Sequence, residues 1–572
     1  MRLGFEWLGE LVPVDMPVGE LVALLDNSGT KVETVRRPGA GIAGVVAAEV
    51  KDVRDHPNAD NLTLVDVALD DGVTQQVVCG ARNFSVGDLV PLATVGSHLP
   101  DMVVGERKIR GVTSRGMLCS AVELGVSRDH SGILVLPPDA APGSDVVAVL
   151  GLDDIVLELE ITPNRPDCMS VIGVAREVAA LTGGELSLPD ARASYDGDLS
   201  SPVSVDVQDT DGCPRYVARY VSGMTPAPSP AWMTARLAAC GIRPISNIVD
   251  ATNYVLLETG QPLHAFDEER VGEKRIVVRR AREGERLETL DGVERTLAPS
   301  DLLICDPAGP LALAGVMGGR ASEVSESTSA VILESAYFDP VTVGRTSRRL
   351  GLRKEASARF ERGADQEMAP WAAARAVKLL VETAGGRGSR HVVDEQSRPV
   401  ERPVVVLRPE RTGLVLGVGI EKDRQAASLR SIGFRVEKHD ASLHAVAPSW
   451  RHDIAREEDL IEEVARLAGL DILPATLPPG ASGGLSKEQS ADRLTRRTLA
   501  GLGMTEAWTE AFAHAGELDR LGLPPDHAAR SVVGIANPMT ENEAALRTTL
   551  LPGLLRSVRH NMHRRATWVD LF

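Results

Sequence analysis

Apolar segments of different length and period follow one another along this chain, separated by polar or Pro/Gly-rich links. Three such links lie at residues 190–202, 395–403 and 478–484. A chain of 572 residues is too long for one hydrophobic core, and links of this composition are typical of domain boundaries. Because strand-like runs alternate with helical patterns, the sequence predicts an α+β protein of roughly three to five domains.

Residues 40–150 differ in pattern from the rest of the chain. Short Val-rich runs at 45–50, 62–69 and 86–95 alternate with turn residues. Evenly spaced short strands without long helical patterns favour a compact antiparallel β-barrel of the OB type. Such small barrels commonly carry RNA contacts.

The charge and cysteine content limit the partners and the compartment. Eighty Asp and Glu against sixty-two Lys and Arg give a formal net charge of −18, so contact with nucleic acid requires local basic patches or a partner. The six cysteines are scattered without a CxxC pair, which favours reduced thiols over a disulfide or zinc framework. With no signal peptide and no apolar run of bilayer length, the sequence predicts a cytoplasmic protein.

One basic cluster stands out in the strand-rich segment. It follows the turn motif HPNADNL (56–62) and the motif VVCGARN (77–83), and it overlaps RGVTSRGMLCS (110–120). The segment as a whole is acidic, so from the residues alone the cluster fits either an RNA contact or a solvated surface. Its members are Arg107, Lys108, Arg110 and Arg115.

Polar residues inside apolar contexts mark residues 246–365. Asn253 lies in SNIVDATNYVLLETGQPLHAFD (246–267) together with His264, and Glu334 lies in ILES (332–335). The segment also contains GVMGG (315–319) and RKEASARFERGAD (353–365). Each polar residue alone could make a structural hydrogen bond, but together with glycines they suit a ligand pocket.

A helix with one acidic face is predicted in APSWRHDIAREEDLIEEVARLAG (447–469). At about 100° per residue, Glu462 and Glu463 lie within about 60° of Asp459. Asp453 approaches from the preceding turn, and apolar residues fill the opposite arc. The stripe is either the wet side of a helix or a site for a hard cation such as Mg²⁺. Because basic residues do not neutralise them fully, we expect these carboxylates to repel one another when the ion is missing.

In this order, the motifs resemble the beta chain of bacterial-type phenylalanyl-tRNA synthetase. The likeness extends through ITPNRPDCMSVIGVAREVAALTG (161–183) to NPMTENEAALRTTLLPGLLRSVRHNMHR (537–564). It implies an OB-fold tRNA-binding domain at 40–150, inserted into a small α+β domain made of 1–39 with 151–195. It further implies an editing domain at 203–395, a small α+β domain with the acidic helix at 404–475, and an incomplete, inactive class II synthetase-like domain at 487–572.

The resemblance also assigns sites and partners. It implies a pocket that hydrolyses tyrosine from tRNA(Phe), while ATP and phenylalanine chemistry belong to the alpha subunit of an alpha2-beta2 heterotetramer. It implies a Mg²⁺ shared with the alpha subunit. Lys354 and Glu355 stand where the family more often has a small hydroxyl residue and Asp. The implied pocket residues are Thr252, Asn253, His264, Gly318, Glu334 and Ala356, and the implied metal ligands are Asp453, Asp459, Glu462 and Glu463.

Three readings therefore follow from the sequence. The first is a tRNA-binding and editing beta subunit that stops at Phe572, before the family's C-terminal anticodon-binding domain. The second is a free-standing trans-editing hydrolase. The third is a tRNA-binding scaffold without catalysis. The sequence contains no P-loop, and it shows no Ser-His-Asp or Cys-His arrangement that would indicate a different chemistry.

Overall fold

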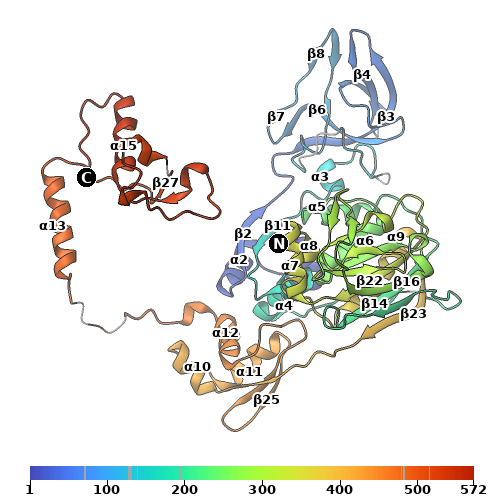
Figure 1. The fold of residues 1–572 in the computed structure, drawn as a ribbon. Coiled ribbons are helices and arrows are strands. Elements are labelled where there is room, and N and C mark those ends of the chain that lie inside the picture. Colours follow the sequence, from blue (N-terminus) through green and yellow to red (C-terminus); the bar gives the residue numbers. More distant parts are fainter. Residues whose placement is uncertain are drawn as a thin grey trace. The chain divides into compact units, whose positions relative to one another are not determined.

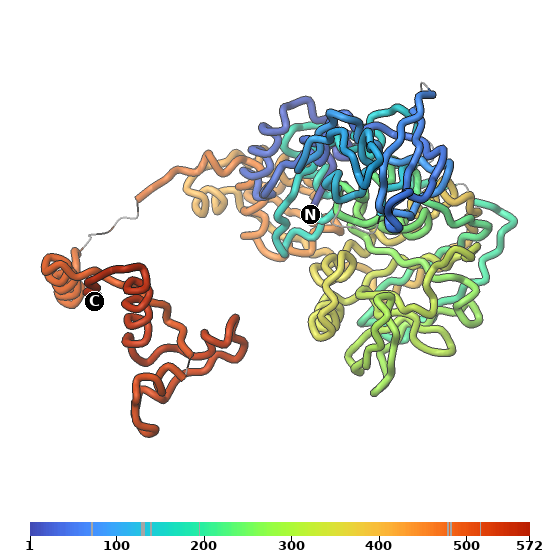
Figure 2. Tube along the Cα trace, turned by 90° about the horizontal axis from the view of Figure 1, so that it is seen from above, coloured from blue at the N-terminus to red at the C-terminus, as the bar shows by residue number. Residues whose placement is uncertain are grey.

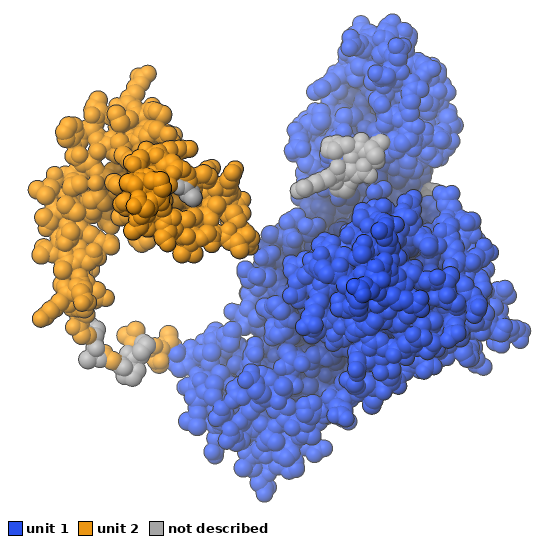
Figure 3. Space-filling view, in the orientation of Figure 1, with its two compact units in different colours: residues 1–474 blue, residues 475–572 orange. Residues whose placement is uncertain are grey.

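The computed structural model divides the chain into two compact units, residues 1–474 and 475–572 (Figure 3). No helix among the described residues is long and apolar enough to cross a membrane. All six cysteines are free, and five of them are buried. The structure describes residues 1–69, 72–126, 132–137, 140–193, 195–477, 480, 483–514 and 516–572.

A three-stranded antiparallel sheet joins the start of the chain to residues beyond 150. The strand order is β1-β11-β2, with β1 (Arg2–Gly4), β11 (Val156–Glu160) and β2 (Lys31–Arg36). The N-terminus therefore lies inside the first unit, beside β11 (Figures 1 and 2). Leu157 and Leu159 of β11 are buried in one core cluster with residues of three helices. These helices are α1 (Phe5–Leu11), α2 (Val18–Asn27) and α4 (Val171–Thr182).

Between β2 and β11 the chain forms a separate antiparallel sheet. Its order is β10-β6-β3-β4-β5, with β7 paired to β6. The Arg115 amide, just before β10, donates to the Gln76 carbonyl on β5 at 3.2 Å, so the two ends of this order approach each other. The strands are β3 (Ala43–His56), β4 (Ala59–Ala68), β5 (Thr74–Cys79), β6 (Leu89–Leu99), β7 (Met102–Val103) and β10 (Met117–Leu118).

Two five-stranded sheets dominate residues 195–396. The first has the order β12-β23-β14-β22-β15 and the second β13-β16-β19-β20-β21. The first consists of β12 (Tyr195–Asp196), β23 (Arg387–Gln396), β14 (Arg215–Ser222), β22 (Ala330–Tyr337) and β15 (Leu263–Asp267). The second consists of β13 (Ser204–Val207), β16 (Arg275–Arg280), β19 (Leu302–Cys305), β20 (Pro310–Leu313) and β21 (Met317–Gly318).

Side chains of β22 alternate between the two faces of the first sheet, as the pleat requires. Leu333 packs in the cluster that includes α6 (Asn247–Thr259) and α9 (Ala369–Ala384). The Ser335 hydroxyl on the same face donates to the Ala369 carbonyl at 2.8 Å. Ile332 and Ala336 instead pack with residues of the second sheet. Glu334, between them, therefore faces the second sheet.

A small α+β unit follows at residues 404–468. Its sheet has the order β24-β26-β25, with β24 (Val404–Leu407), β26 (Leu443–Val446) and β25 (Arg435–Lys438). Three helices accompany it: α10 (Pro409–Leu416), α11 (Lys422–Ser431) and α12 (Glu457–Ala468). Leu460, Ile461 and Val464 of α12 are buried in the core of this unit, at the spacing of one helical face.

The second unit contains mostly exposed elements. Its two longer helices, α13 (Lys487–Gly501) and α15 (Leu551–His563), have no buried residue. A two-stranded sheet pairs β27 (Phe512–Ala513) with β28 (Ala545–Leu546). Together the described residues form a multidomain α+β protein, as the sequence predicts.

Candidate functional site

Glu334 and His264 lie side by side between the two large sheets. In the antiparallel ladder of β22 and β15, Glu334 is directly opposite His264, and on its other side it faces Ala218 of β14. Directly opposed residues in such a ladder place their Cβ atoms about 5 Å apart on the same face. Strand pairing therefore fixes both side chains at one place.

The Glu334 carboxyl is buried, with 7% of the residue exposed. Burial raises its pKa from the ordinary 4.5 to about 7, although a hydrogen bond from Tyr216 acts in the opposite direction. The Tyr216 hydroxyl donates to Glu334 Oε2 at 2.8 Å. The other oxygen, Oε1, has no hydrogen-bond partner among the described residues. One acceptor atom of a largely buried carboxyl is thus available to a ligand.

His264 has a buried ring nitrogen that is left without a partner. Its Nε2 makes no hydrogen bond within the described part of the chain. Burial lowers the pKa of His264 from 6.5 to about 4, so the imidazole is neutral at neutral pH. The ring contacts Phe266 edge to face, with centroids 4.6 Å apart. A buried unpaired nitrogen is costly unless a ligand or water completes it.

Gly318 brings the backbone of the second sheet against this histidine. A Cβ at Gly318 would lie 2.6 Å from Cε1 and 2.9 Å from Nε2 of His264. The Leu290 amide donates to the Gly318 carbonyl at 3.0 Å, which holds the strand in place. Only glycine therefore fits here without displacing His264.

The other residues predicted for the pocket come from two helices. Thr252 and Asn253 lie on α6, which contacts β15, and the Thr252 hydroxyl donates to the Val249 carbonyl of its own helix at 2.7 Å. Ala356 lies on α8 (Glu355–Phe360) and packs against the core cluster. Glu334, His264 and Gly318 are thus brought together directly, while Thr252, Asn253 and Ala356 lie on separate helices.

Glu355, one of the two departures from the family pattern, forms an ion pair. Its carboxylate accepts from Arg359 Nη1 at 2.7 Å. Arg359 is almost fully buried and also donates to the Met169 carbonyl at 2.8 and 3.1 Å. Glu355 therefore neutralises an arginine that ties α8 to the segment before α4.

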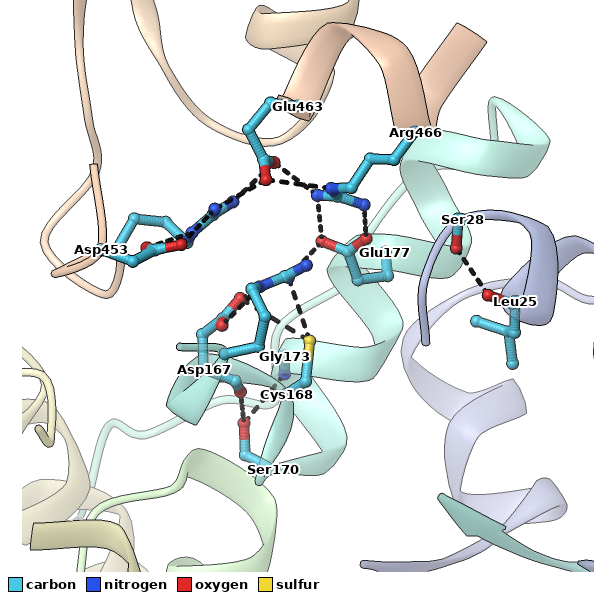
Figure 4. Close-up of polar contacts among 12 residues, drawn as sticks. Leu25, Ser28, Asp167, Cys168, Ser170, Gly173, Glu177, Asp453, Glu463 and Arg466 are labelled. Carbon is cyan, nitrogen blue, oxygen red and sulfur yellow. Dashed lines mark hydrogen bonds and ion pairs between the residues drawn. The ribbon is translucent and has the colours of Figure 1, made fainter. Parts of the chain in front are cut away.

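The four acids predicted on and before α12 have different surroundings from one another. Glu463 is buried and accepts hydrogen bonds from Arg451 and, as Figure 4 shows, from Arg466. Glu462 is exposed. Burial opposes ionisation of Glu463, but the hydrogen bonds from Arg451 and the charge of Arg466 outweigh it and lower its pKa. Asp453 also accepts from Arg451, at 2.8 Å.

These arginines correct our expectation of an acidic face that basic residues do not neutralise fully. Asp459 Oδ2 accepts the backbone N–H groups of Ala455 and Arg456, both at 2.8 Å, as a cap on α12. Within the described ranges, no three of the four predicted ligands bring their oxygens within 4.8 Å of one another. In this arrangement the carboxylates do not form a ready cage for a cation.

The arginine network continues from α12 to α4 (Figure 4). Arg466 donates to Glu177, with one distance of 3.1 Å and one shorter contact, and Arg165 donates to the same carboxylate at 2.7 Å. The group Asp167, Cys168 and Glu177 has ligand atoms within 4.8 Å of one another, but Arg165 donates to all three. Guanidinium groups thus fill the space between these acids.

The predicted tRNA-contacting residues lie on and beside a short hairpin. Strands β8 (Arg107–Ile109) and β9 (Val112–Ser114) are joined by Arg110 and Gly111, both with positive φ. Asn58 Nδ2 donates to the Arg110 carbonyl at 3.0 Å, which connects the first motif of this segment to the third. All four basic side chains, Arg107, Lys108, Arg110 and Arg115, are exposed.

Sequence reasoning missed Tyr216 and the arginines. Tyr216 is 118 residues from Glu334, and the available signal was a pair of tyrosines, Tyr216 and Tyr220, in the strand-like segment PRYVARYV at 214–221. Arg451, Arg466 and Arg165 lie close in sequence to acids. That proximity was a usable signal for neutralised, rather than metal-binding, carboxylates.

Comparison with protein families defines the class of the chain. Residues 45–145 match the tRNA binding domain family, 212–385 the B3/4 domain, and 405–470 the tRNA synthetase B5 domain. Residues 473–572 match the phenylalanyl tRNA synthetase beta chain CLM domain. The chain is thus a tRNA-binding component of an aminoacyl-tRNA synthetase, a ligase of protein biosynthesis.

Individual relatives narrow the class further. The phenylalanine–tRNA ligase beta subunit of Anaeromyxobacter dehalogenans is 47% identical over 580 residues, covering 100% of this chain and 72% of the relative. That of Salinibacter ruber is 44% identical, covering 98% and 70%. The chain therefore belongs to the bacterial phenylalanine–tRNA ligase beta subunit family. An N-terminal fragment of the Pyrococcus horikoshii beta subunit aligns over 82% of this chain and 99% of its own, at 13% identity and a TM-score of 0.35, too low to bear on the fold.

Proposed function

We propose that this chain edits tRNA(Phe), hydrolysing tyrosine esterified to it at a site built from Glu334, His264 and Gly318. The single observation that carries the proposal is the buried Glu334 carboxyl with one unoccupied oxygen beside the unpartnered His264 Nε2. In this account the aminoacylation chemistry, with ATP, belongs to the alpha subunit of an alpha2-beta2 assembly.

A second site is needed because a pocket for phenylalanine rejects tyrosine poorly. An apolar pocket cannot strongly exclude a ligand that merely adds a hydroxyl, whereas a site with a buried acceptor can require it. A tyrosyl hydroxyl would donate to Glu334 Oε1, while a phenylalanyl ring would cover that oxygen and leave it unpaired. Leaving a buried acceptor unpaired costs about 1–3 kcal/mol or more when it is charged.

His264 suits the hydrolytic step. Its neutral Nε2 can accept a hydrogen bond from water and orient the water oxygen toward the ester carbonyl carbon. The new bond forms from that oxygen to the carbon, the ester C–O bond breaks, and the terminal ribose of tRNA leaves as a hydroxyl with the proton. The products are free tyrosine and uncharged tRNA. We assign Thr252, Asn253 and Ala356 to the wider pocket.

We further propose that residues 40–150 form an OB-type barrel that contacts tRNA through the exposed hairpin residues Arg107, Lys108, Arg110 and Arg115. These cations neutralise phosphate locally on an otherwise acidic chain, which agrees with sequence-independent backbone contact. We likewise propose the other domains predicted from the sequence, with bounds 1–39 with 151–195, 203–395, 404–475 and 487–572.

The Mg²⁺ shared with the alpha subunit remains a proposal for Asp453, Asp459, Glu462 and Glu463. These residues do not fit a preformed site, because Arg451 and Arg466 occupy the Glu463 carboxylate. An ion there would have to displace charge-assisted hydrogen bonds, which are among the stronger interactions in proteins. No step of the hydrolysis depends on it.

The test is deacylation of tyrosyl-tRNA(Phe) by the chain purified with its alpha subunit. Glu334→Ala should reduce the preference for tyrosine over phenylalanine, and His264→Ala should slow hydrolysis of both by roughly a hundredfold. Wild-type hydrolysis that needs no alpha subunit would favour the free-standing hydrolase. Binding of tRNA without any deacylation would favour the scaffold.

A further inference from the structure

Tyr216 is the residue that holds the proposed tyrosine acceptor in place. It lies on β14, the central strand of its sheet, which is paired on one side with β22 and on the other with β23. Its side chain is fully buried, and the hydroxyl donates to Glu334 Oε2 at 2.8 Å. In the register, Tyr216 is opposite Ala336, so it reaches Glu334 diagonally across two residues. Diagonal neighbours in a ladder are within reach of an aromatic side chain.

This contact limits what the carboxyl can do. The terminal torsion of a glutamate is broad, so an unrestrained carboxyl rotates freely. The bond from Tyr216 occupies Oε2 and leaves Oε1 as the oxygen without a partner among the described residues. When Glu334 takes up a proton, that proton is directed to Oε1, because Oε2 already accepts from Tyr216. Oε1 then becomes a donor and ceases to be a charged acceptor.

We propose that Tyr216 is a positioning residue for selectivity: by holding Glu334 Oε2, it presents Oε1 as the acceptor that recognises the hydroxyl of a mischarged tyrosine. This inference rests on the proposed editing function. A purely structural role, in which the buried phenol simply needs a partner, makes a different prediction, since it would affect stability and leave substrate preference unchanged.

Tyr216→Phe in the complex with the alpha subunit separates the two roles, because it removes one oxygen and keeps the ring. We expect KM for tyrosyl-tRNA(Phe) to rise roughly tenfold while kcat changes little, since a hydrogen bond to a charged group is involved. Hydrolysis of phenylalanyl-tRNA(Phe) should stay at the wild-type rate. The pH midpoint of the tyrosine preference should move upward, because the lost bond had favoured the carboxylate.

Tyr220→Phe is the matched control. Tyr220 lies on the same strand and face, opposite Ile332, and is only half-buried. The Tyr220→Phe variant should retain the wild-type KM for tyrosyl-tRNA(Phe) and the wild-type pH midpoint of the tyrosine preference. If Tyr216→Phe also retains the wild-type KM and pH midpoint, the positioning role of Tyr216 is overturned, while the proposed editing function is unaffected. If wild type shows no preference for tyrosine, the proposed function fails first.

A spectroscopic measurement keeps the inference testable should Tyr216→Phe not fold. Site-specific 3-fluorotyrosine at position 216 retains the hydroxyl. Its fluorine resonance should titrate with Glu334 near pH 7 and lose that titration in Glu334→Gln. A resonance that is flat across this range in the otherwise unchanged protein would contradict the contact.

Discussion

His264 is paired directly with Glu334 across the β15–β22 ladder. Burial lowers the pKa of His264 and raises the pKa of Glu334, so it favours the uncharged form of both side chains. The histidine stays neutral above about pH 4, and the glutamate ionises near pH 7. Two adjacent groups with such different titrations suit two tasks, orienting water and recognising a hydroxyl.

Substrate preference should depend on pH through Glu334. Its pKa is raised to about 7, so the carboxylate acceptor dominates above that pH and the neutral acid below it. Because charged acceptors make the stronger hydrogen bonds, the preference for tyrosyl over phenylalanyl-tRNA(Phe) should rise several-fold between pH 6 and pH 8. Glu334→Gln cannot titrate and should show a flat ratio; a flat ratio in wild type would contradict this assignment.

Glu334 should also lower the stability of the folded protein at high pH. Its folded pKa of about 7 is above its ordinary 4.5, so the stability present below pH 4.5 is lost as the pH rises through 7. Glu334→Gln removes this loss and should stabilise the protein by up to roughly 3 kcal/mol at pH 8. Denaturant unfolding at pH 5 and pH 8 measures the difference. Glu33→Gln, on an exposed side chain, should have an effect within about 0.5 kcal/mol at both.

Gly318→Ala should impair hydrolysis without affecting tRNA binding. The new methyl would lie 2.6 Å from His264 Cε1 and must displace the ring. A shift of about 1 Å in a reacting group can cost roughly a hundredfold in rate. Gly309→Ala is the control, because its Cβ meets nothing within 4 Å. Equal deacylation rates for both variants would remove Gly318 from the site.

The arginine network should contribute strongly to stability. Arg466→Met leaves Glu177 and Glu463 with fewer partners in a buried setting, which typically costs about 3–5 kcal/mol. Lys31→Met breaks the exposed pair with Glu160 and should lower the unfolding temperature far less than Arg466→Met does. Thermal unfolding of the two variants tests the contrast. Similar small shifts for both would show that the network contributes little.

The basic hairpin should determine how tRNA binding depends on salt. Replacing Arg107, Lys108, Arg110 and Arg115 with Ala removes four exposed cations, so the slope of log K against log salt should become less steep. Filter binding of tRNA(Phe) across a salt series gives the slope. Arg192→Ala, another exposed arginine, is expected to leave it unchanged. An unaltered slope in the fourfold variant would show that these four side chains do not contact the tRNA phosphates.

Local periodicity predicted the buried face of α12 but not the surroundings of its acids. The spacing of Leu460, Ile461 and Val464 is enough to define an apolar arc. The burial of Glu463 depends on Arg451, twelve residues away and outside the helix. Likewise, the Tyr216–Glu334 contact follows from strand pairing across more than a hundred residues. Contacts that tertiary pairing creates leave no periodic signal in the sequence.

The most direct test of the central claim is a competition in one tube. Tyrosyl-tRNA(Phe) and phenylalanyl-tRNA(Phe), carrying different labels, are mixed with the wild-type chain and its alpha subunit at pH 8, and release of each amino acid is followed. The account predicts much faster release of tyrosine, with the ratio falling in Glu334→Ala. Equal release of the two amino acids by the wild-type protein would contradict it.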